Sequence, residues 1–191
     1  MTSDAILFVT LIATALAAAF AILWLRGRKA VAGRGTTEAW ILIDGSNVMH
    51  WQDGVPDLAP LLGVVERLQD MGYVPGVVFD ANAGWKLQGR YLHDAELAWL
   101  LGIEDRQVLV VPKGSPADAF LLETAREFGV RIVTNDRYRD WAGKHPEVQD
   151  PEFLIRGGVR AGEVWLSGLA PQDGAHGATG VRSESSTRRS R

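Results

Sequence analysis

Four short apolar segments of the chain alternate with longer segments that repeat apolar residues at helical spacing. The apolar segments cover residues 40–43, 74–79, 108–111 and 131–134. The helical segments between them cover residues 58–71, 93–101 and 117–128. Such alternation is typical of a parallel sheet with helices packed on both faces. The sequence therefore predicts an α/β fold with a mainly parallel, twisted sheet, to which residues 153–159 and 163–166 add a small hairpin or edge strand.

Aspartate residues stand where the predicted strands end. Asp44, Asp80 and Asp136 follow three of the apolar segments, Asp140 comes four residues after Asp136, and Asp118 opens the last helical segment. Connections between parallel strands are short and right-handed, so the carboxyl ends of the strands lie along one edge of the sheet. Ligands of open α/β sheets bind at that edge. We therefore expect the aspartates to gather there, with Asp44 beside Asp136 if the first and fourth strands are neighbours.

Carboxylates gathered in one place repel one another unless protons or a cation lie between them. A phosphodiester is itself an anion, and one or two Mg²⁺ or Mn²⁺ ions can neutralise its charge and activate a water molecule. The five aspartates therefore predict a divalent metal site for phosphate chemistry. The alternative for single residues is a helix cap at Asp118 and a turn at Asp80, because aspartate is common in both places.

Composition limits the kind of metal and the kind of partner. The absence of cysteine excludes disulfide bonds and thiolate zinc sites. The four histidines are scattered without a pair at ligand spacing, so any metal ion would be bound by oxygen ligands. Residues 39–169 carry 19 acidic and 12 basic side chains, which is not the usual charge balance of a nucleic-acid-binding domain. Bound cations would offset part of that negative charge.

Residues 5–25 form a stretch of 21 residues without a charged side chain. In a helix that rises about 1.5 Å per residue, this length crosses the hydrocarbon core of a membrane. Basic residues follow the stretch and only Asp4 precedes it, which predicts an amino terminus outside and a cytoplasmic location for the rest. The alternative is a cleaved signal peptide, although such peptides begin with basic residues and have a shorter apolar region. Ala13, Ala17 and Ala21 would allow two such helices to approach closely, as in a homodimer.

The sequence thus predicts four parts. Residues 1–25 are expected to form a single-pass transmembrane anchor, and residues 26–38 a basic juxtamembrane linker interrupted by glycines. Residues 39–169 are expected to form the folded domain. Residues 170–191 are rich in Gly, Ser, Thr and Arg and are expected to form a disordered tail.

Two motifs at the predicted strand ends resemble those of a known nuclease family. The first is Ile43-Asp44-Gly45-Ser46-Asn47-Val48, and the second is Thr134-Asn135-Asp136-Arg137-Tyr138-Arg139-Asp140. Together with Ala117-Asp118-Ala119-Phe120, they are similar to the motifs of the NYN/PIN-like ribonucleases, specifically the Regnase (MCPIP) type. The resemblance covers residues 40–141. It implies a three-layer PIN-like nuclease domain at residues 39–169 and Mg²⁺-dependent cleavage of single-stranded or looped RNA.

The resemblance also assigns roles to single residues. Asp44, Asp118 and Asp136 look like the metal-binding carboxylates, Asp140 looks like a fourth acidic ligand or a brace, and catalytic Asn47 would hydrogen-bond a carboxylate or the scissile phosphate. Two departures are visible. The family has two adjacent aspartates where this chain has Ala117-Asp118, so one ligand is missing unless Asp80 replaces it. Without cysteine, the chain also lacks the Cys-rich zinc finger of the Regnase proteins.

Further candidate RNA-binding residues follow the same strand ends. Trp51, like Trp85 and Trp141, could stack an unpaired base, and the alternative is a tryptophan that covers the core. Lys113, Arg137 and Arg139 could contact phosphates, and the alternative is ordinary surface charge.

The leading hypothesis is a membrane-anchored, metal-dependent endoribonuclease. The alternative is a catalytically weak or inactive module of the same fold that binds RNA or a protein partner, which Ala117 and the acidic domain favour. A metal-dependent adhesion site is excluded because Val48 occupies the last ligand position of its Asp-x-Ser-x-Ser motif. A haloacid-type phosphatase is disfavoured because Ser46 stands where its Asp-x-Asp motif requires the second aspartate.

Overall fold

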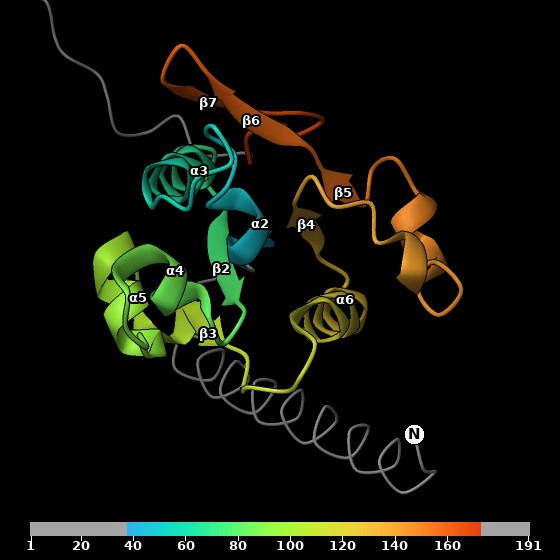
Figure 1. Ribbon diagram of the computed structural model, residues 1–191. Coiled ribbons are helices and arrows are strands. Elements are labelled where there is room, and N and C mark those ends of the chain that lie inside the picture. Colours follow the sequence, from blue (N-terminus) through green and yellow to red (C-terminus); the bar gives the residue numbers. More distant parts are fainter. Residues whose placement is uncertain (1–37, 173–191) are drawn as a thin grey trace, which may run out of the picture.

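Five parallel strands form the central sheet, in the order β3-β2-β1-β4-β5 (Figure 1). The computed structural model describes residues 38–172 of the chain. The strands are β1 (Trp40–Asp44), β2 (Val74–Phe79), β3 (Val108–Val110), β4 (Arg131–Val133) and β5 (Leu154–Ile155). A separate antiparallel hairpin consists of β6 (Gly157–Arg160) and β7 (Glu163–Leu166). The predicted α/β fold with a parallel sheet is therefore confirmed, and the carboxyl-terminal region supplies both an edge strand and a hairpin.

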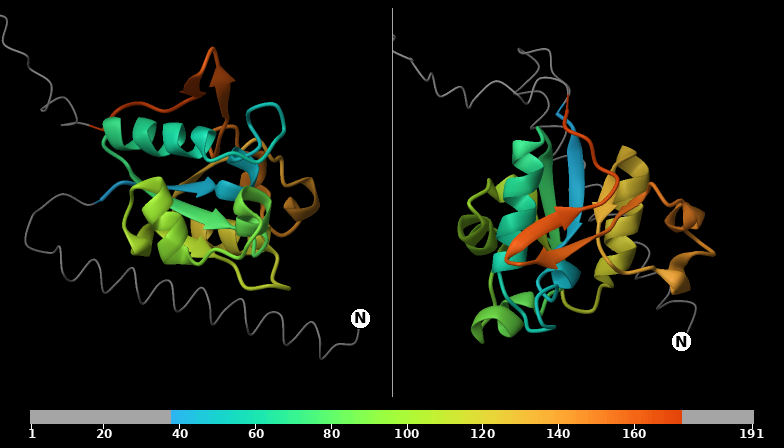
Figure 2. Two further views of the ribbon diagram at one scale, coloured as in Figure 1. Left: turned by 60° about the vertical axis from the view of Figure 1, so that its left-hand side comes forward. Right: turned by 90° about the horizontal axis from the view of Figure 1, so that it is seen from above.

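The helices lie on both faces of the sheet. They are α2 (Gly45–Val48), α3 (Ala59–Asp70), α4 (Ala83–Gln88), α5 (Asp94–Leu101) and α6 (Ala117–Phe128). Figure 2 shows α3 and α6 on opposite sides of β1. Three 3₁₀ helices complete the described chain: η1 (Asp105–Gln107), η2 (Arg139–Trp141) and η3 (Pro146–Gln149). The sequence did not predict α2 and α4, because both are too short to show a helical repeat.

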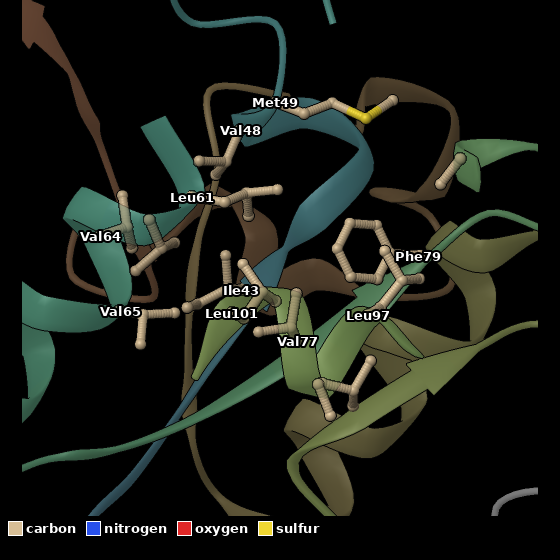
Figure 3. Packing of buried hydrophobic residues seen from close by; sticks show 14 of the residues in the cluster. Ile43, Val48, Met49, Leu61, Val64, Val65, Val77, Phe79, Leu97 and Leu101 are labelled. Atoms are coloured by element: carbon tan, nitrogen blue, oxygen red, sulfur yellow. The ribbon is translucent and has the colours of Figure 1, made fainter. Parts of the chain in front are cut away.

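Alternate residues of each strand enter two separate cores. Ile41 and Ile43 of β1 pack on the α3–α5 side with Val77 and Phe79 of β2, as Figure 3 shows for part of this cluster. Leu42 between them packs on the α6 side. Because successive side chains of a strand point to opposite faces, one apolar run can fill both layers.

The ends of the longer helices are defined by local sequence. In α5 the His93 side chain and Glu96 form a reciprocal capping box with backbone N–H groups. The helix α6 ends at Gly129, whose φ of +63° is a left-handed conformation that glycine adopts without strain. The helix α6 contacts β1 and β2.

Several predictions fall on residues outside the described part of the chain. The transmembrane anchor and the basic linker up to Thr37 lie there, as does the tail from residue 173 onward. Within residues 38–172, no helix combines the length and apolarity needed to cross a membrane. The folded chain continues past residue 169, because Ala170 accepts a hydrogen bond from the Tyr73 hydroxyl and Gln172 donates one to Met71.

A candidate active site at the carboxyl edge of the sheet

Asp44 is the buried centre of the candidate site. It is the last residue of β1, only 8% exposed, and it caps the short helix α2. Oδ1 accepts the backbone N–H of Asn47 at 3.0 Å, while Oδ2 accepts the hydroxyls of Thr134 at 3.0 Å and Tyr138 at 2.8 Å. Burial raises the pKa of Asp44 to about 6, against the lowering effect of these three hydrogen bonds. The carboxylate is therefore held in one orientation by three donors.

The other residues of the first motif connect the ends of three strands. Gly45 lies so close to β2 that a Cβ atom would be 2.6 Å from the Phe79 ring. The Ser46 hydroxyl accepts the backbone N–H of Asp80 at 2.8 Å. Asn47 Oδ1 accepts the backbone N–H of Asn135 and the indole N–H of Trp51, both at 2.9 Å. The predicted contact between Asn47 and a carboxylate is present through its backbone, whereas its side-chain oxygen holds the loop after β4.

The expected adjacency of the first and fourth strands is confirmed. Ile43 of β1 pairs with Val133 of β4, which places Asp44 beside Thr134. The Thr134 hydroxyl donates to Asp44 and accepts the backbone N–H of Asp136 at 3.0 Å. Asp136 Oδ1 accepts the backbone N–H of Tyr138 at 2.7 Å, and Tyr138 adopts a left-handed backbone with a φ of +48°. Asp136 is exposed, whereas Asp44 is buried.

Asp118 links the remaining carboxylates. It lies half-buried on the first turn of α6. Burial raises its pKa, and the negative charges of Asp136 and Asp80 raise the pKa further, while hydrogen bonding by the Trp141 side chain lowers it. The charge of Asp118 also raises the pKa of Asp44. Asp118 thus interacts electrostatically with Asp44, Asp80 and Asp136, and these four of the five predicted aspartates form one coupled group at this edge.

The fifth aspartate, Asp140, lies outside this group, and the described residues show no ready arrangement of metal ligands. Asp140 is exposed on η2 and, among residues 38–172, interacts with none of the other four carboxylates. In the same part of the chain, no three His, Asp or Glu side chains are arranged to hold a metal ion. No described Lys or Arg side chain forms an ion pair with the four coupled aspartates.

The candidate RNA-binding residues have different environments. Lys113 follows β3, and Arg137 and Arg139 follow β4; all three are exposed. Trp51 is partly buried against the α3-side core, and its indole N–H is bound to Asn47. Trp85 on α4 is 59% exposed, so its ring is much more available to a base than that of Trp51.

Three site residues were not identified from the sequence. Thr134 and Tyr138 belong to the second motif, and their position beside a buried aspartate was the available signal. Arg156 lies between β5 and β6, where its Nη1 donates to the carbonyls of Thr134 and Asp136. Nothing in the sequence around Arg156 indicates this contact.

Comparisons with known proteins agree with the fold and the motifs. No curated protein matches the sequence of this chain. Among solved structures, two of nuclear protein-only RNase P 2 (PRORP2) from Arabidopsis thaliana resemble it, with TM-scores of 0.52 and 0.51 at 16% and 23% identity. They match 84% and 86% of this chain, which covers 37% and 36% of the PRORP2 chains, and they support the fold alone.

A family model supplies the assignment that these distant structures cannot. The model of the Zc3h12a-like ribonuclease NYN domain matches residues 37–152, more than half of the chain and all four coupled aspartates. The chain therefore belongs to the Zc3h12a-like ribonuclease NYN domain family.

Proposed function

We propose that this protein is an endoribonuclease that hydrolyses RNA phosphodiester bonds at the carboxyl edge of its sheet with the help of Mg²⁺ or Mn²⁺. The observation that carries the proposal is the coupling of Asp44, Asp80, Asp118 and Asp136, whose charges are not neutralised by a described basic side chain. A cation would remove the repulsion that raises the pKa of Asp118. Membership in a ribonuclease family supports the same reaction.

The donor set suits a hard divalent cation by its chemistry, although no three of its side chains are arranged around one point within residues 38–172. Carboxylate oxygens are the ligands that Mg²⁺ prefers, usually one or two per ion with water in the remaining positions. Asp44, Asp118 and Asp136 would hold the ion, and Asp80 would occupy the place left by Ala117. Asp140 is left out of this ligand set because it lies apart from the coupled group and is exposed. When bound, such an ion neutralises the phosphate charge and lowers the pKa of a coordinated water molecule.

The protein's own residues would orient the reactants. The three donors to Asp44 prevent its carboxylate from rotating, and Asn47 ties the loop that carries Asp136 to α2. Asp136 is exposed, so RNA can reach the site from solvent. Lys113, Arg137 and Arg139 would contact phosphates on either side of the cleaved bond, which adds affinity without sequence specificity.

The test compares cleavage of unstructured and hairpin RNA by the full chain in mild detergent, with Mn²⁺, with Mg²⁺ and with excess EDTA. We expect cleavage with either ion, none in EDTA, and a loss of at least about 100-fold in Asp136→Asn. Asp70→Asn is the matched control, because Asp70 lies at the far end of α3 and is exposed. Cleavage that continues undiminished in EDTA would contradict the proposal.

The second candidate is an RNA-binding module that does not cleave. Its support is Ala117, which is apolar, packs against the α6-side core and cannot be a ligand. The absence of a ready three-residue metal group within residues 38–172 also favours it. Purified protein that binds RNA and Mn²⁺ without producing cleavage fragments would identify this function.

We further propose that residues 1–25 anchor the domain to the cytoplasmic face of a membrane. The uncharged stretch and the basic residues after it are the support. Carbonate extraction of membranes should leave the intact chain in the pellet, and its release into the supernatant would exclude the anchor. Crosslinking of the Ala17→Leu variant beside the wild type would test whether the alanine row mediates a homodimer.

A further inference from the structure

The loop that carries Asp136 is fastened to a segment beyond the family match. The match ends at residue 152, whereas the contacts come from Ile155, Arg156 and Gly157. The backbone N–H of Thr134 donates to the carbonyl of Ile155 at 3.1 Å. Nη1 of Arg156 donates to the carbonyls of Thr134 at 3.1 Å and Asp136 at 2.6 Å. One guanidinium nitrogen therefore holds the carbonyls on both sides of Asn135.

Asn135 and Gly157 complete this connection. The Asn135 side chain donates to the carbonyl of Gly157 at 2.9 Å and accepts its N–H at 3.3 Å. Gly157 also contacts the Trp51 ring, since a Cβ atom there would be 2.7 Å from two ring carbons. Trp51 in turn donates to Asn47. The segment therefore supports both motifs of the site.

We propose that Arg156 is a positioning residue that fixes Asp136 and Thr134 in the geometry needed for metal binding and RNA cleavage. Its role in catalysis rests on the proposed function, but its effect on the loop does not. Hydrogen bonds from a charged donor are stronger than those between neutral groups, and Arg156 is the only charged donor to this loop among the described residues. Thr134 then transmits the position to Asp44, because its hydroxyl bridges Asp44 and Asp136.

The first test measures the loop without reference to activity. Hydrogen–deuterium exchange of the full chain should show that Arg156→Ala speeds exchange of the backbone amides of residues 134–138 by about tenfold or more. Exchange in β1 and α3 should remain as in the wild type. Arg160→Ala is the matched control, because Arg160 lies exposed at the end of β6, four residues after Arg156, and makes no hydrogen bond with the loop. Unchanged protection of residues 134–138 in Arg156→Ala would overturn the proposal.

The second test separates positioning from direct RNA binding. For residues that orient metal ligands, substitution commonly costs about 10–100-fold in activity or metal affinity. We expect Arg156→Ala to lower kcat by that factor and to raise the Mn²⁺ concentration needed for half activity, with little change in the KM for RNA. Arg156→Lys should recover part of kcat, because one ammonium group can reach both carbonyls. A raised KM with unchanged kcat would identify Arg156 as a substrate-binding residue and exclude the positioning role.

The two tests also separate this inference from the proposed function. If the wild type cleaves no RNA, the proposed reaction is wrong, while faster exchange in Arg156→Ala still supports the role of Arg156 in holding the loop. If the wild type cleaves and Arg156→Ala matches it in kcat, metal requirement and exchange, only the role of Arg156 is excluded.

Discussion

Tyr138 donates its phenolic hydrogen to Oδ2 of Asp44 over 2.8 Å, although 94 residues separate the two in the chain. Both side chains are buried. Burial raises the pKa of Tyr138 far above its usual value, and the charge of Asp44 raises it further, so the phenol stays protonated. Tyr138 is therefore a permanent donor that lowers the pKa of Asp44 against the effect of burial.

Replacing Tyr138 by Phe should move the pH dependence of the site. Without the phenolic hydrogen bond, the pKa of Asp44 rises, so more of this carboxylate is protonated near pH 6. We expect the acidic limb of the cleavage profile, and of Mn²⁺ binding, to shift to higher pH. The lost hydrogen bond should also cost about 1 kcal/mol of unfolding free energy. Tyr91→Phe is the control, and identical pH profiles for Tyr138→Phe and wild type would contradict the role of the phenol.

Asp44→Asn should change how stability depends on pH. The pKa of Asp44 is about 6 in the folded protein, above its usual value of 3.8. The folded state therefore binds this proton more tightly than the unfolded state does. The stabilisation that the proton provides is complete below pH 3.8 and is lost as the pH rises through 6. For metal-free wild type this loss is on the order of 3 kcal/mol by pH 7. Urea unfolding in EDTA should show that the unfolding free energy of the wild type declines over this pH range and that of Asp44→Asn does not. Equal slopes of unfolding free energy against pH for the two proteins would refute the prediction.

Trp51 and Trp85 should respond differently to substitution by alanine. Trp51 holds Asn47 and contacts Gly157, so Trp51→Ala should lower the unfolding free energy by about 2 kcal/mol or more. Any loss of RNA binding would accompany that loss of stability. The measurement is thermal unfolding beside binding of single-stranded RNA, and a Trp51→Ala variant of normal stability with weak RNA binding would restore the stacking role.

Trp85→Ala should weaken RNA binding and leave stability nearly unchanged. Its ring is 59% exposed, so its removal should leave stability nearly unchanged. Stacking on one base contributes about 1–3 kcal/mol, and affinity for unpaired RNA should fall accordingly. Binding of double-stranded RNA serves as the control, because paired bases are not available to stack. Unchanged affinity for single strands would remove Trp85 from the RNA path.

Gly84→Ala should destabilise the domain next to the site. A Cβ atom at Gly84 would lie 2.5 Å from the backbone nitrogen of Leu92 and 2.7 Å from the carbonyl oxygen of Arg90. Backbone atoms cannot rotate away as side chains do, so the variant should lose about 1–3 kcal/mol. Gly143→Ala is the matched control, because nothing lies within 4 Å of a Cβ there. Equal melting temperatures for the two variants would contradict the packing argument.

The parallel sheet and the meeting of distant aspartates were predictable because both follow from strand order. Apolar runs marked β1 and β4, and their adjacency brought Asp44 next to the loop of Asp136. The electrostatic link from Asp118 to Asp80 was not predictable in detail, since it depends on where α6 begins above the strand ends. Asp140 lies exposed on the 3₁₀ helix η2, which begins directly after Tyr138.

The hydrogen bonds that support the site were the harder part. Asn47 was expected to hydrogen-bond a carboxylate or the scissile phosphate; its backbone N–H binds Asp44, while Trp51 and Asn135 donate to its side-chain oxygen. Arg156 lies inside the segment predicted as a hairpin or edge strand, but its role could not be found because its contacts are to carbonyls that every residue possesses. Contacts to backbone carbonyls cannot be predicted from the types of the residues that carry them.

The place of β4 between β1 and β5 has a consequence for biosynthesis. The ribosome completes β1, β2 and β3 first, and until residues 131–133 are translated one side of β1 has no strand to pair with. During that interval the nascent domain exposes an unpaired strand, which favours association with other chains. Asp44 also lacks the hydroxyl donors of Thr134 and Tyr138 at that stage. A truncated product that ends before β4 would therefore be prone to aggregation and would lack the assembled candidate site.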